Sequence, residues 1–115
     1  GFSEAGGYLA MQQLLPRQPD AIFAASDAMA MGALRALREA GLRVPEDVAL
    51  IGFDDLPFAA RAEPPLTTVR QPTHRMGAMT VETLIELIEQ PPSSPYHLIL
   101  PTELVVRASC GATLK

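Results

Sequence analysis

Two short apolar segments on either side of one helix-like segment constrain the fold of this chain most. Residues 21–25, AIFAA, form a continuous apolar run of the kind found in strands buried on both faces of a parallel sheet. A helix is predicted over 28–40, with Ser26 as a candidate N-cap and Gly41 at its end. A second apolar strand, VALIG, is predicted over 48–52. This order predicts a βαβ unit with a right-handed crossover, and therefore an α/β fold with a parallel sheet, part of which we expect outside this chain.

Further elements on both sides of this unit fit the same class. Ser3 is a plausible N-cap for a helix over 3–15, in which Tyr8, Met11 and Leu15 share one face. The remaining elements are predicted as a loop or short helix at 56–65, a strand at 66–69, a helix at about 73–90, a surface loop at 91–95, and two short strands in HLILP and ELVVRAS.

The composition fits one folded domain and excludes several classes of protein. The chain has 115 residues, of which 48% are hydrophobic and 19% charged, and no apolar run reaches the ~18 residues of a membrane span. Nine Lys and Arg are scattered among 13 carboxylates, which excludes a nucleic-acid surface formed by this segment alone. A single cysteine, Cys110, excludes an internal disulfide and a cysteine-based zinc cluster. Without an initiator Met, the chain is expected to be cut from a longer protein.

Polar residues follow both predicted strands of the βαβ unit. Ser26 and Asp27 come after the first strand, and Asp54 and Asp55 after the second. Because parallel strands bind ligands at their carboxyl ends, Ser26 and Asp54 are predicted to face one crevice. An ionised Asp accepts hydrogen bonds only, which suits the paired hydroxyl donors of a sugar. The alternative is structural, with a helix cap at Ser26-Asp27 and a turn at Asp55. The cap is favoured for Asp27 and ligand contact for Asp54.

Phe2 stands just before the N-terminus of the first predicted helix. A flat aromatic side chain there could stack on the apolar face of a ring. The local pattern alone favours the alternative, a core residue or a hydrophobic staple.

No pattern for catalysis or metal binding is present. The side chains of the adjacent Asp54 and Asp55 diverge, so they do not form an acid/base pair by themselves. His74 and His97 lack metal-ligand spacing to each other and to Cys110. The phosphate-loop, nucleophile-elbow and dinucleotide motifs are absent. We therefore predict no catalytic residue, no metal site, no cofactor and no enzymatic activity.

An outward methionine marks the helix at 28–40. Its polar residues Arg35, Arg38 and Glu39 define the outer face, and Met31 lies on that face one turn before Arg35. A Met among Arg residues is a candidate contact with a partner. A lone surface Met without a role is the alternative.

Three motifs in a fixed order carry a resemblance to a known family. SDAMAMGALRAL, VPEDVALIGFDD and PPLTTVRQP together closely resemble the effector-binding domain of the LacI/GalR family of bacterial transcription regulators. The resemblance extends from residue 2 to residue 109. It implies a periplasmic-binding-protein-like (type I) fold, a three-layer α/β/α parallel sheet present here as an incomplete C-terminal fragment. Residues 1–66 would belong to the C-terminal lobe, 67–97 to a crossover and a helix of the N-terminal lobe, and 98–115 to the return crossover strand and tail.

The resemblance also implies roles for individual residues. Asp54 matches the acidic residue that hydrogen-bonds effector hydroxyls, Phe2 matches the aromatic that packs on the ligand ring, and Ser26 stands where many members have Asn. Thr73 and Met76 match positions that line the cleft. The dimer interface would involve Met31, Arg35, Ala59 and Ala62.

The function implied is that of a cytoplasmic repressor-type regulator that responds to a small, sugar-like effector. Operator DNA would be bound through a headpiece absent from this chain, the protein would be a homodimer, and no membrane would be involved. The alternative is a sugar-binding protein of a transport system with the same fold.

Overall fold

The computed structural model describes residues 2–91 and 101–112, apart from the side chains of residues 73 and 74. It divides into two compact units, Gly1–Arg70 with Glu103–Lys115, and Gln71–Thr102. The first unit contains α1 (Glu4–Leu14), η1 (Leu15–Arg17), β1 (Ala21–Phe23), α2 (Asp27–Glu39), β2 (Ala49–Ile51), η2 (Pro57–Arg61), β3 (Thr68–Arg70) and β4 (Glu103–Val105), and the second contains α3 (Thr73–Glu89).

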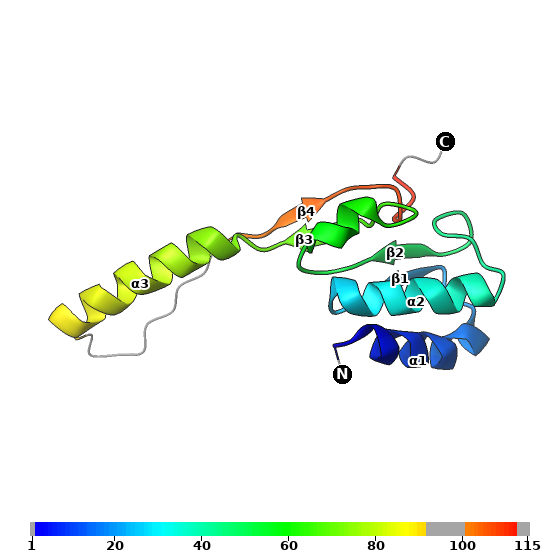
Figure 1. Ribbon diagram of the computed structural model, residues 1–115, viewed down its shortest axis with the longest axis horizontal. Helices are drawn as coiled ribbons and strands as arrows, with labels where there is room; N and C mark the ends of the chain where they lie inside the picture. The colour runs from blue at the N-terminus through cyan, green and yellow to red at the C-terminus, as the bar shows by residue number, and fades with distance from the viewer. Residues whose placement is uncertain (1, 92–100, 113–115) are drawn as a thin grey trace. The chain divides into compact units, whose positions relative to one another are not determined.

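Parallel pairing of β1 with β2 confirms the predicted βαβ arrangement. The central pair in their register is Ile22 with Leu50, and α2 connects the two strands. A parallel bridge from Ile51 to Thr67 continues the pairing toward β3, which pairs antiparallel with β4. Helices α1 and α2 lie side by side next to this sheet (Figure 1).

Local capping explains where the two helices of the first unit begin and end. The Ser3 hydroxyl accepts a hydrogen bond from the backbone N–H of Gly6 at 3.0 Å, and the Ser26 hydroxyl accepts one from Met29 at 3.1 Å. After α2, Gly41 takes a φ of +78°, the left-handed conformation that glycine adopts without steric cost. The predicted caps Ser3 and Ser26 and the predicted stop at Gly41 are therefore confirmed.

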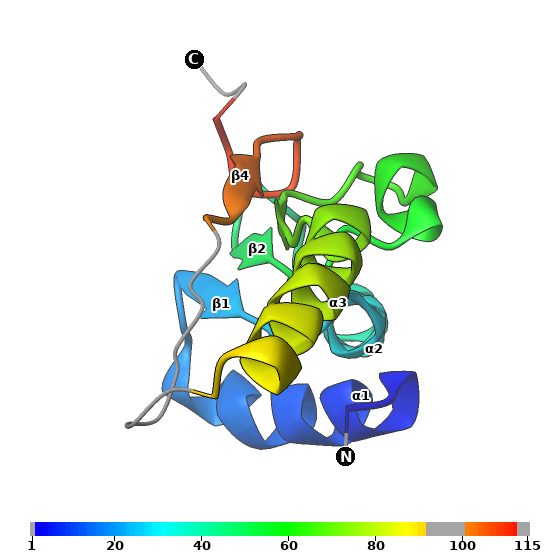
Figure 2. The same cartoon turned by 90° about the vertical axis from the view of Figure 1, so that its left-hand side faces the viewer.

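Glycines let α1 and α2 approach backbone to backbone. A Cβ atom on Gly7 would overlap the carbonyl oxygen of Met29, and one on Gly32 would overlap the carbonyl oxygen of Glu4. Both positions therefore require the absence of a side chain, and the two helices, which together form the helical layer, lie directly against each other (Figure 2).

The core of the first unit lies between this helical layer and the sheet. Its largest apolar members are Met11, Leu34, Leu37, Leu50 and Leu66. Tyr8 and Leu15 pack against it, as the predicted face of the first helix requires.

The prediction that both faces of residues 21–25 are buried is wrong for β1. Ile22 packs against the core, but Ala21 is exposed and Phe23 is 63% exposed. Successive side chains of a strand point to opposite faces, and no described element covers the second face of this short strand.

Buried polar groups join the strands of the first unit beyond their regular pairing. The Ser109 hydroxyl donates to the carbonyl oxygen of Leu50 at 2.5 Å and accepts from the N–H of Thr67 at 2.8 Å. The Thr67 hydroxyl in turn accepts from the N–H of Arg107 at 2.8 Å. The chain segment after β4 is thereby fixed to both β2 and the start of β3.

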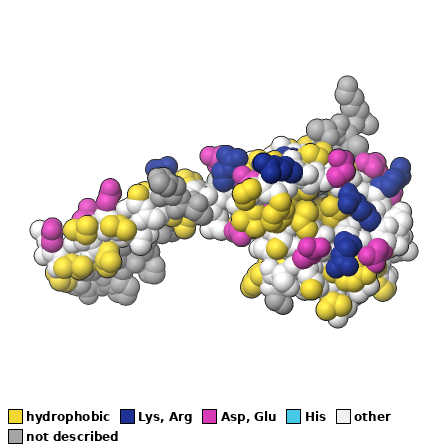
Figure 3. All heavy atoms as spheres, in the orientation of Figure 1, with side chains coloured by type: hydrophobic (Ala, Val, Ile, Leu, Met, Phe, Trp, Pro, Cys, Tyr) yellow, Lys and Arg dark blue, Asp and Glu magenta, His cyan; other side chains and the backbone are white. Residues whose placement is uncertain are grey.

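The second unit is described as the single helix α3, which matches the helix predicted at 73–90. Its apolar side chains Val81, Leu84, Ile85 and Ile88 are all more than half exposed. Hydrophobic side chains are accordingly visible on the surface of α3 (Figure 3). Residues 92–100, which include most of the predicted loop and the HLILP strand, lie outside the described part of the chain. Among the described residues, no helix is long and apolar enough to cross a membrane.

Candidate functional site

The carboxyl ends of β1 and β2 meet, as the strand order predicts. The backbone N–H of Asp27, just after β1, donates to the carbonyl oxygen of Phe53, just after β2, at 2.9 Å. Ser26 and the turn at Asp54 therefore occupy the same edge of the sheet, where open α/β sheets bind ligands.

Ser26 joins this edge to the start of the chain. Its hydroxyl caps α2 and also donates to the carbonyl oxygen of Phe2 at 3.4 Å. The side chain is 8% exposed, so the helix-cap interpretation is confirmed for Ser26. Phe2 is 74% exposed, so its interpretation as a core or staple residue is wrong.

Two consecutive left-handed residues form the turn after β2. Asp54 has a φ of +112° and Asp55 a φ of +54°, conformations that residues with a side chain rarely adopt, although Asp adopts them more often than most. The N–H of Asp54 donates to the carbonyl oxygen of Val69 at 2.8 Å, and the N–H of Asp55 donates to the Thr68 hydroxyl at 3.2 Å. The side chain of Asp54 is half-buried at this edge.

The Asp55 carboxylate lies between two arginines. Its two oxygens are 2.8 Å from Arg70 Nε and 2.9 Å from Arg107 Nη1, and its side chain is 12% exposed. Burial alone would raise the pKa of Asp55, but hydrogen bonds from Arg70 and Arg107 outweigh it and hold the pKa of this carboxyl below its usual value. Asp55 is therefore a turn residue, as predicted, and also an ionised anchor for the strands β3 and β4.

Asp27 has a different role from the predicted helix cap. It is the first residue of α2 and is fully buried. One carboxylate oxygen accepts from the N–H of Leu56 at 2.7 Å and the other from the Thr68 hydroxyl at 2.6 Å. The prediction was wrong because the partners of Asp27 come from segments far along the chain, which a local capping rule does not include.

Sequence reasoning missed Thr68, Arg70 and Arg107 in this network. The available signal was the pair of adjacent carboxylates after a buried strand, since a partly buried carboxylate requires a cationic or hydrogen-bonding partner. The spacing along the chain does not show which arginine supplies it.

The remaining two predicted effector residues belong to the second unit. Thr73 begins α3, and its side chain lies outside the described residues. Met76 is 37% exposed one turn later. The structure thus brings Phe2, Ser26 and Asp54 together within one unit, and their relation to Thr73 and Met76 stays a prediction.

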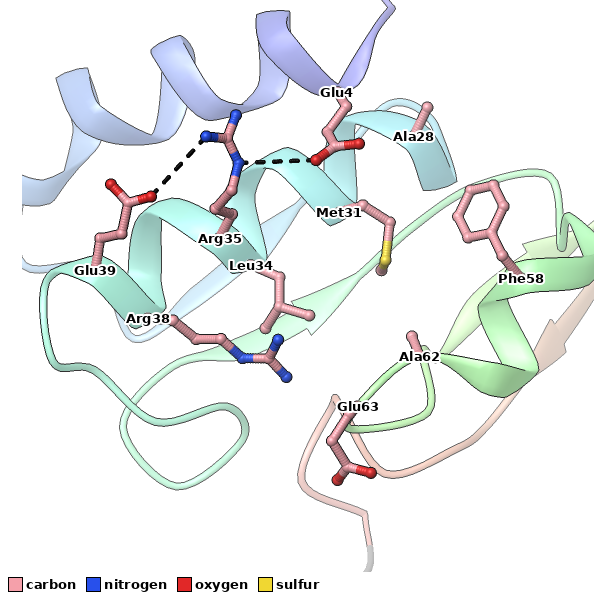
Figure 4. A pocket seen from close by; sticks show the side chains of 10 residues that line it. All are labelled: Glu4, Ala28, Met31, Leu34, Arg35, Arg38, Glu39, Phe58, Ala62 and Glu63. Atoms are coloured by element: carbon pink, nitrogen blue, oxygen red, sulfur yellow. Dashed lines mark ion pairs between the residues drawn. The ribbon is translucent and has the colours of Figure 1, made fainter.

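A second feature is a groove of about 580 Å³ between the helical layer and the segment around η2. Figure 4 shows Met31 and Leu34 of α2 facing Phe58 and Ala62 across it. Hydrophobic side chains gather over α2 and η2 with charged groups at their border (Figure 3). Met31 and Ala62, both predicted partner contacts, line this groove.

Arg35 is held at the edge of the groove by several contacts. It pairs with Glu4 at 3.7 Å and Glu39 at 3.9 Å, and its guanidinium lies 3.9 Å from the centre of the Tyr8 ring. The Tyr8 hydroxyl donates to Glu39 at 2.5 Å, and this hydrogen bond is the largest of the causes that raise the pKa of Tyr8. These contacts place Arg35 among the groove residues, in agreement with its predicted outer-face position.

Ala59 is the exception among the predicted interface residues. It is fully buried, and the N–H of Leu66 donates to its carbonyl oxygen at 2.8 Å. Ala59 therefore does not line the groove and cannot present its side chain to a partner.

Comparison with known proteins identifies the family of this chain. Residues 1–110 match the model of a family described as the periplasmic binding protein-like domain. The chain belongs to this family. The LacI/GalR resemblance of the sequence motifs is also confirmed, because the similar proteins include named members of the LacI family.

Among curated proteins, this LacI/GalR-family chain is 49% identical over 110 residues to the HTH-type transcriptional regulator CelR of Thermobifida fusca. It is 44% identical over 110 residues to the ribose operon repressor of Escherichia coli K12. Both alignments cover 94% of this chain. They cover 32% of the CelR chain and 33% of the ribose operon repressor. The chain thus spans about a third of the length of the curated relatives it matches.

The similar solved structures also include transcriptional regulators. A complex of the transcriptional regulator CelR with cellobiose matches with a TM-score of 0.86 and 48% identity, over 94% of this chain and 34% of that one. The lac repressor dimer bound to operator and the anti-inducer ONPF matches with a TM-score of 0.85 and 34% identity. This match covers 94% of this chain and 33% of the repressor chain.

Proposed function

We propose that this LacI/GalR-family chain is the effector-binding and dimerisation portion of a repressor-type transcriptional regulator that responds to a sugar. The carrying observation is the edge at the carboxyl ends of β1 and β2. There an Asp54 carboxylate, held by backbone contacts in a left-handed turn, lies with Ser26 and an exposed Phe2. Relatives bound to cellobiose and to ribose support a sugar as the ligand class.

Each residue has a chemical role in this proposal. The Asp54 carboxylate accepts hydrogen bonds from sugar hydroxyls, and the exposed Phe2 ring stacks on the apolar face of the sugar. Ser26 adds a weaker polar contact, because its hydroxyl is already engaged. Thr73 and Met76, which belong to the second unit, are kept as predicted effector residues on the family resemblance alone.

Effector binding then controls DNA binding through linkage. A sugar that binds one arrangement of the protein better than another shifts the population toward that arrangement. A change of ~100-fold in operator affinity requires about 3 kcal/mol of differential binding. Operator DNA is bound by a headpiece outside this chain, and a second copy occupies the groove formed by Met31, Arg35 and Ala62. The proposed location is the cytoplasm, and no enzymatic activity is assigned.

The first test is the coding sequence upstream of Gly1. A helix-turn-helix followed by the rest of a first lobe is expected. A signal peptide leading directly into that lobe would favour the alternative, a sugar-binding protein of a transport system. In that case the sugar-contact proposal would remain, and the DNA and dimer proposals would be withdrawn.

The second test is direct binding. The full protein, as its gene encodes it, is titrated with cellobiose, ribose and a panel of other mono- and disaccharides by calorimetry. Saturable binding of one of them is expected, and a protein that binds none of the panel contradicts the sugar proposal.

A further inference from the structure

We infer that Asp55, together with Arg70 and Arg107, is a positioning group that holds Asp54 in its ligand-binding conformation. This inference rests on the proposed function, because it takes Asp54 to be the sugar-contacting carboxylate. Asp55 itself is assigned no contact with the sugar, since both of its oxygens are already bonded to arginines.

The first observation is the conformation that must be held. Two adjacent residues with side chains, Asp54 and Asp55, both have positive φ values of +112° and +54°. Such conformations are sparsely populated and persist only where surrounding contacts determine them, typically at binding sites. Without those contacts the turn would relax, and the Asp54 carboxylate would change its direction.

The second observation is the set of contacts that holds the turn. Three consecutive backbone N–H groups donate to neighbouring segments. The N–H of Asp54 donates to the carbonyl oxygen of Val69 at 2.8 Å, and the N–H of Asp55 donates to the Thr68 hydroxyl at 3.2 Å. The N–H of Leu56 donates to the Asp27 carboxylate at 2.7 Å. These bonds fix the backbone against β3 and α2.

The Asp55 side chain adds the remaining anchor. Arg70 ends β3, and Arg107 follows β4, so one carboxylate joins the turn to both strands. Arg107 also donates to the carbonyl oxygen of Leu66 at 2.9 Å, which fixes its own position. Each oxygen therefore accepts a charge-assisted hydrogen bond, a kind of bond that is stronger than one between neutral groups.

The test compares Asp55→Asn with Asp54→Asn and with their double variant, in the full protein. The matched control is Asp47→Asn, which removes a carboxylate bonded to Arg43 on an exposed part of the same unit. The first readout is amide hydrogen exchange without ligand. Asp55→Asn should speed exchange at residues 54–56 roughly tenfold, as expected for one lost charge-assisted hydrogen bond, and leave the helices α1 and α2 unchanged.

The second readout is affinity for the sugar that binds best in the panel, with cellobiose and ribose tested first. Asp54→Asn and Asp55→Asn should each weaken binding roughly tenfold. The double variant should match Asp54→Asn alone within about twofold, because a positioning group has no effect once its target is lost.

Different failures have different meanings. Unchanged exchange at residues 54–56, unchanged affinity in Asp55→Asn, or additive losses in the double variant would each overturn the positioning role while Asp54 remains a contact. Unchanged affinity in Asp54→Asn, or no sugar bound by the unaltered protein, would overturn the proposed contact and the inference together. If Asp55→Asn does not fold, Arg70→Gln removes one of the two anchors from a half-exposed position and should shift both readouts in the same direction.

Discussion

At the scale of single residues, adjacent aspartates after β2 have different tasks. Asp54 lies at the edge proposed to bind the ligand, whereas Asp55 is bonded to Arg70 and Arg107. In our proposal, the same residue type serves ligand recognition at position 54 and anchoring at position 55. The cause is the turn itself, which directs successive side chains to different neighbours.

Replacing Asp54 by Ala should abolish the response to the effector and leave the fold intact, because the carboxylate is lost while the backbone bond to Val69 remains. The measurement is operator binding in the full protein, titrated with the sugar it binds. Asp47→Ala, on the exposed Arg43 pair, is the control. An unchanged response in Asp54→Ala would exclude Asp54 from the effector site.

The Asp55 anchor should also affect stability at acid pH. The pKa of Asp55 is lower in the folded protein than in the unfolded chain, so its contribution is fully present above the unfolded pKa, near 3.9, and is lost as pH falls toward the folded pKa. Urea midpoints at pH 6 and pH 3 should therefore differ less in Asp55→Asn than in the unaltered protein. The exposed Glu82→Gln is the control, and an equal difference in all three proteins would contradict the prediction.

At the scale of elements, two helices share a contact that leaves no room for side-chain atoms. Gly7 of α1 and Gly32 of α2 each face the backbone of the other helix. Packing of this kind depends on exact spacing between the helices, since a core cannot absorb an added methyl group without a shift.

Gly32→Ala should therefore destabilise the first unit by about 1–3 kcal/mol, despite the better helix propensity of Ala. The matched control is Gly77→Ala in α3, where a Cβ atom meets nothing within 4 Å and where stability should stay equal or rise. Urea unfolding followed by circular dichroism measures both. A Gly32→Ala protein as stable as the original would mean that the helices can separate at little cost.

Element positions were predictable from the sequence where local chemistry determines them. Ser3, Ser26 and Gly41 set the helix ends through contacts within a few residues, and these were predicted correctly. The strand predicted from residue 66 begins at Thr68 instead. The reason is non-local, because the backbone N–H of Leu66 donates to Ala59 in η2 and that of Thr67 donates to the Ser109 hydroxyl.

In the candidate site, too, features set by the local sequence could be predicted and features set by non-local contacts could not. The shared edge of Ser26 and Asp54 could be predicted, because both residues come shortly after the paired strands β1 and β2. The partners Arg70 and Arg107 could not, because only the folded arrangement brings β3 and the segment after β4 to the turn. The exposure of Phe23 was also missed, since an apolar run does not show which of its faces is covered.

At the scale of the whole molecule, the groove lined by Met31 and Ala62 is the surface proposed for a second copy. Its apolar floor and its charged border at Arg35 resemble the core and rim of a protein interface. Ala59, the fourth predicted interface residue, is buried in the core and does not line the groove.

Met31→Arg should weaken dimerisation of the full protein at least about tenfold, because the charge would have to be buried in an apolar contact. Sedimentation over a micromolar concentration series measures this. The control Gln12→Arg adds the same charge on an exposed position of α1 that does not line the groove. An unaltered mass for Met31→Arg would remove this residue from the interface.

The antiparallel pairing of β3 with β4 makes the second unit an insertion. Arg70 and Glu103, the last and first residues of these strands, are direct cross-strand partners, so the chain leaves and re-enters the first unit through one hairpin base. A two-residue Asn-Gly turn is the natural closure for such a base. Replacing residues 71–102 by that turn would join β3 directly to β4, and cooperative thermal melting of the shortened chain would show that the first unit folds without the second.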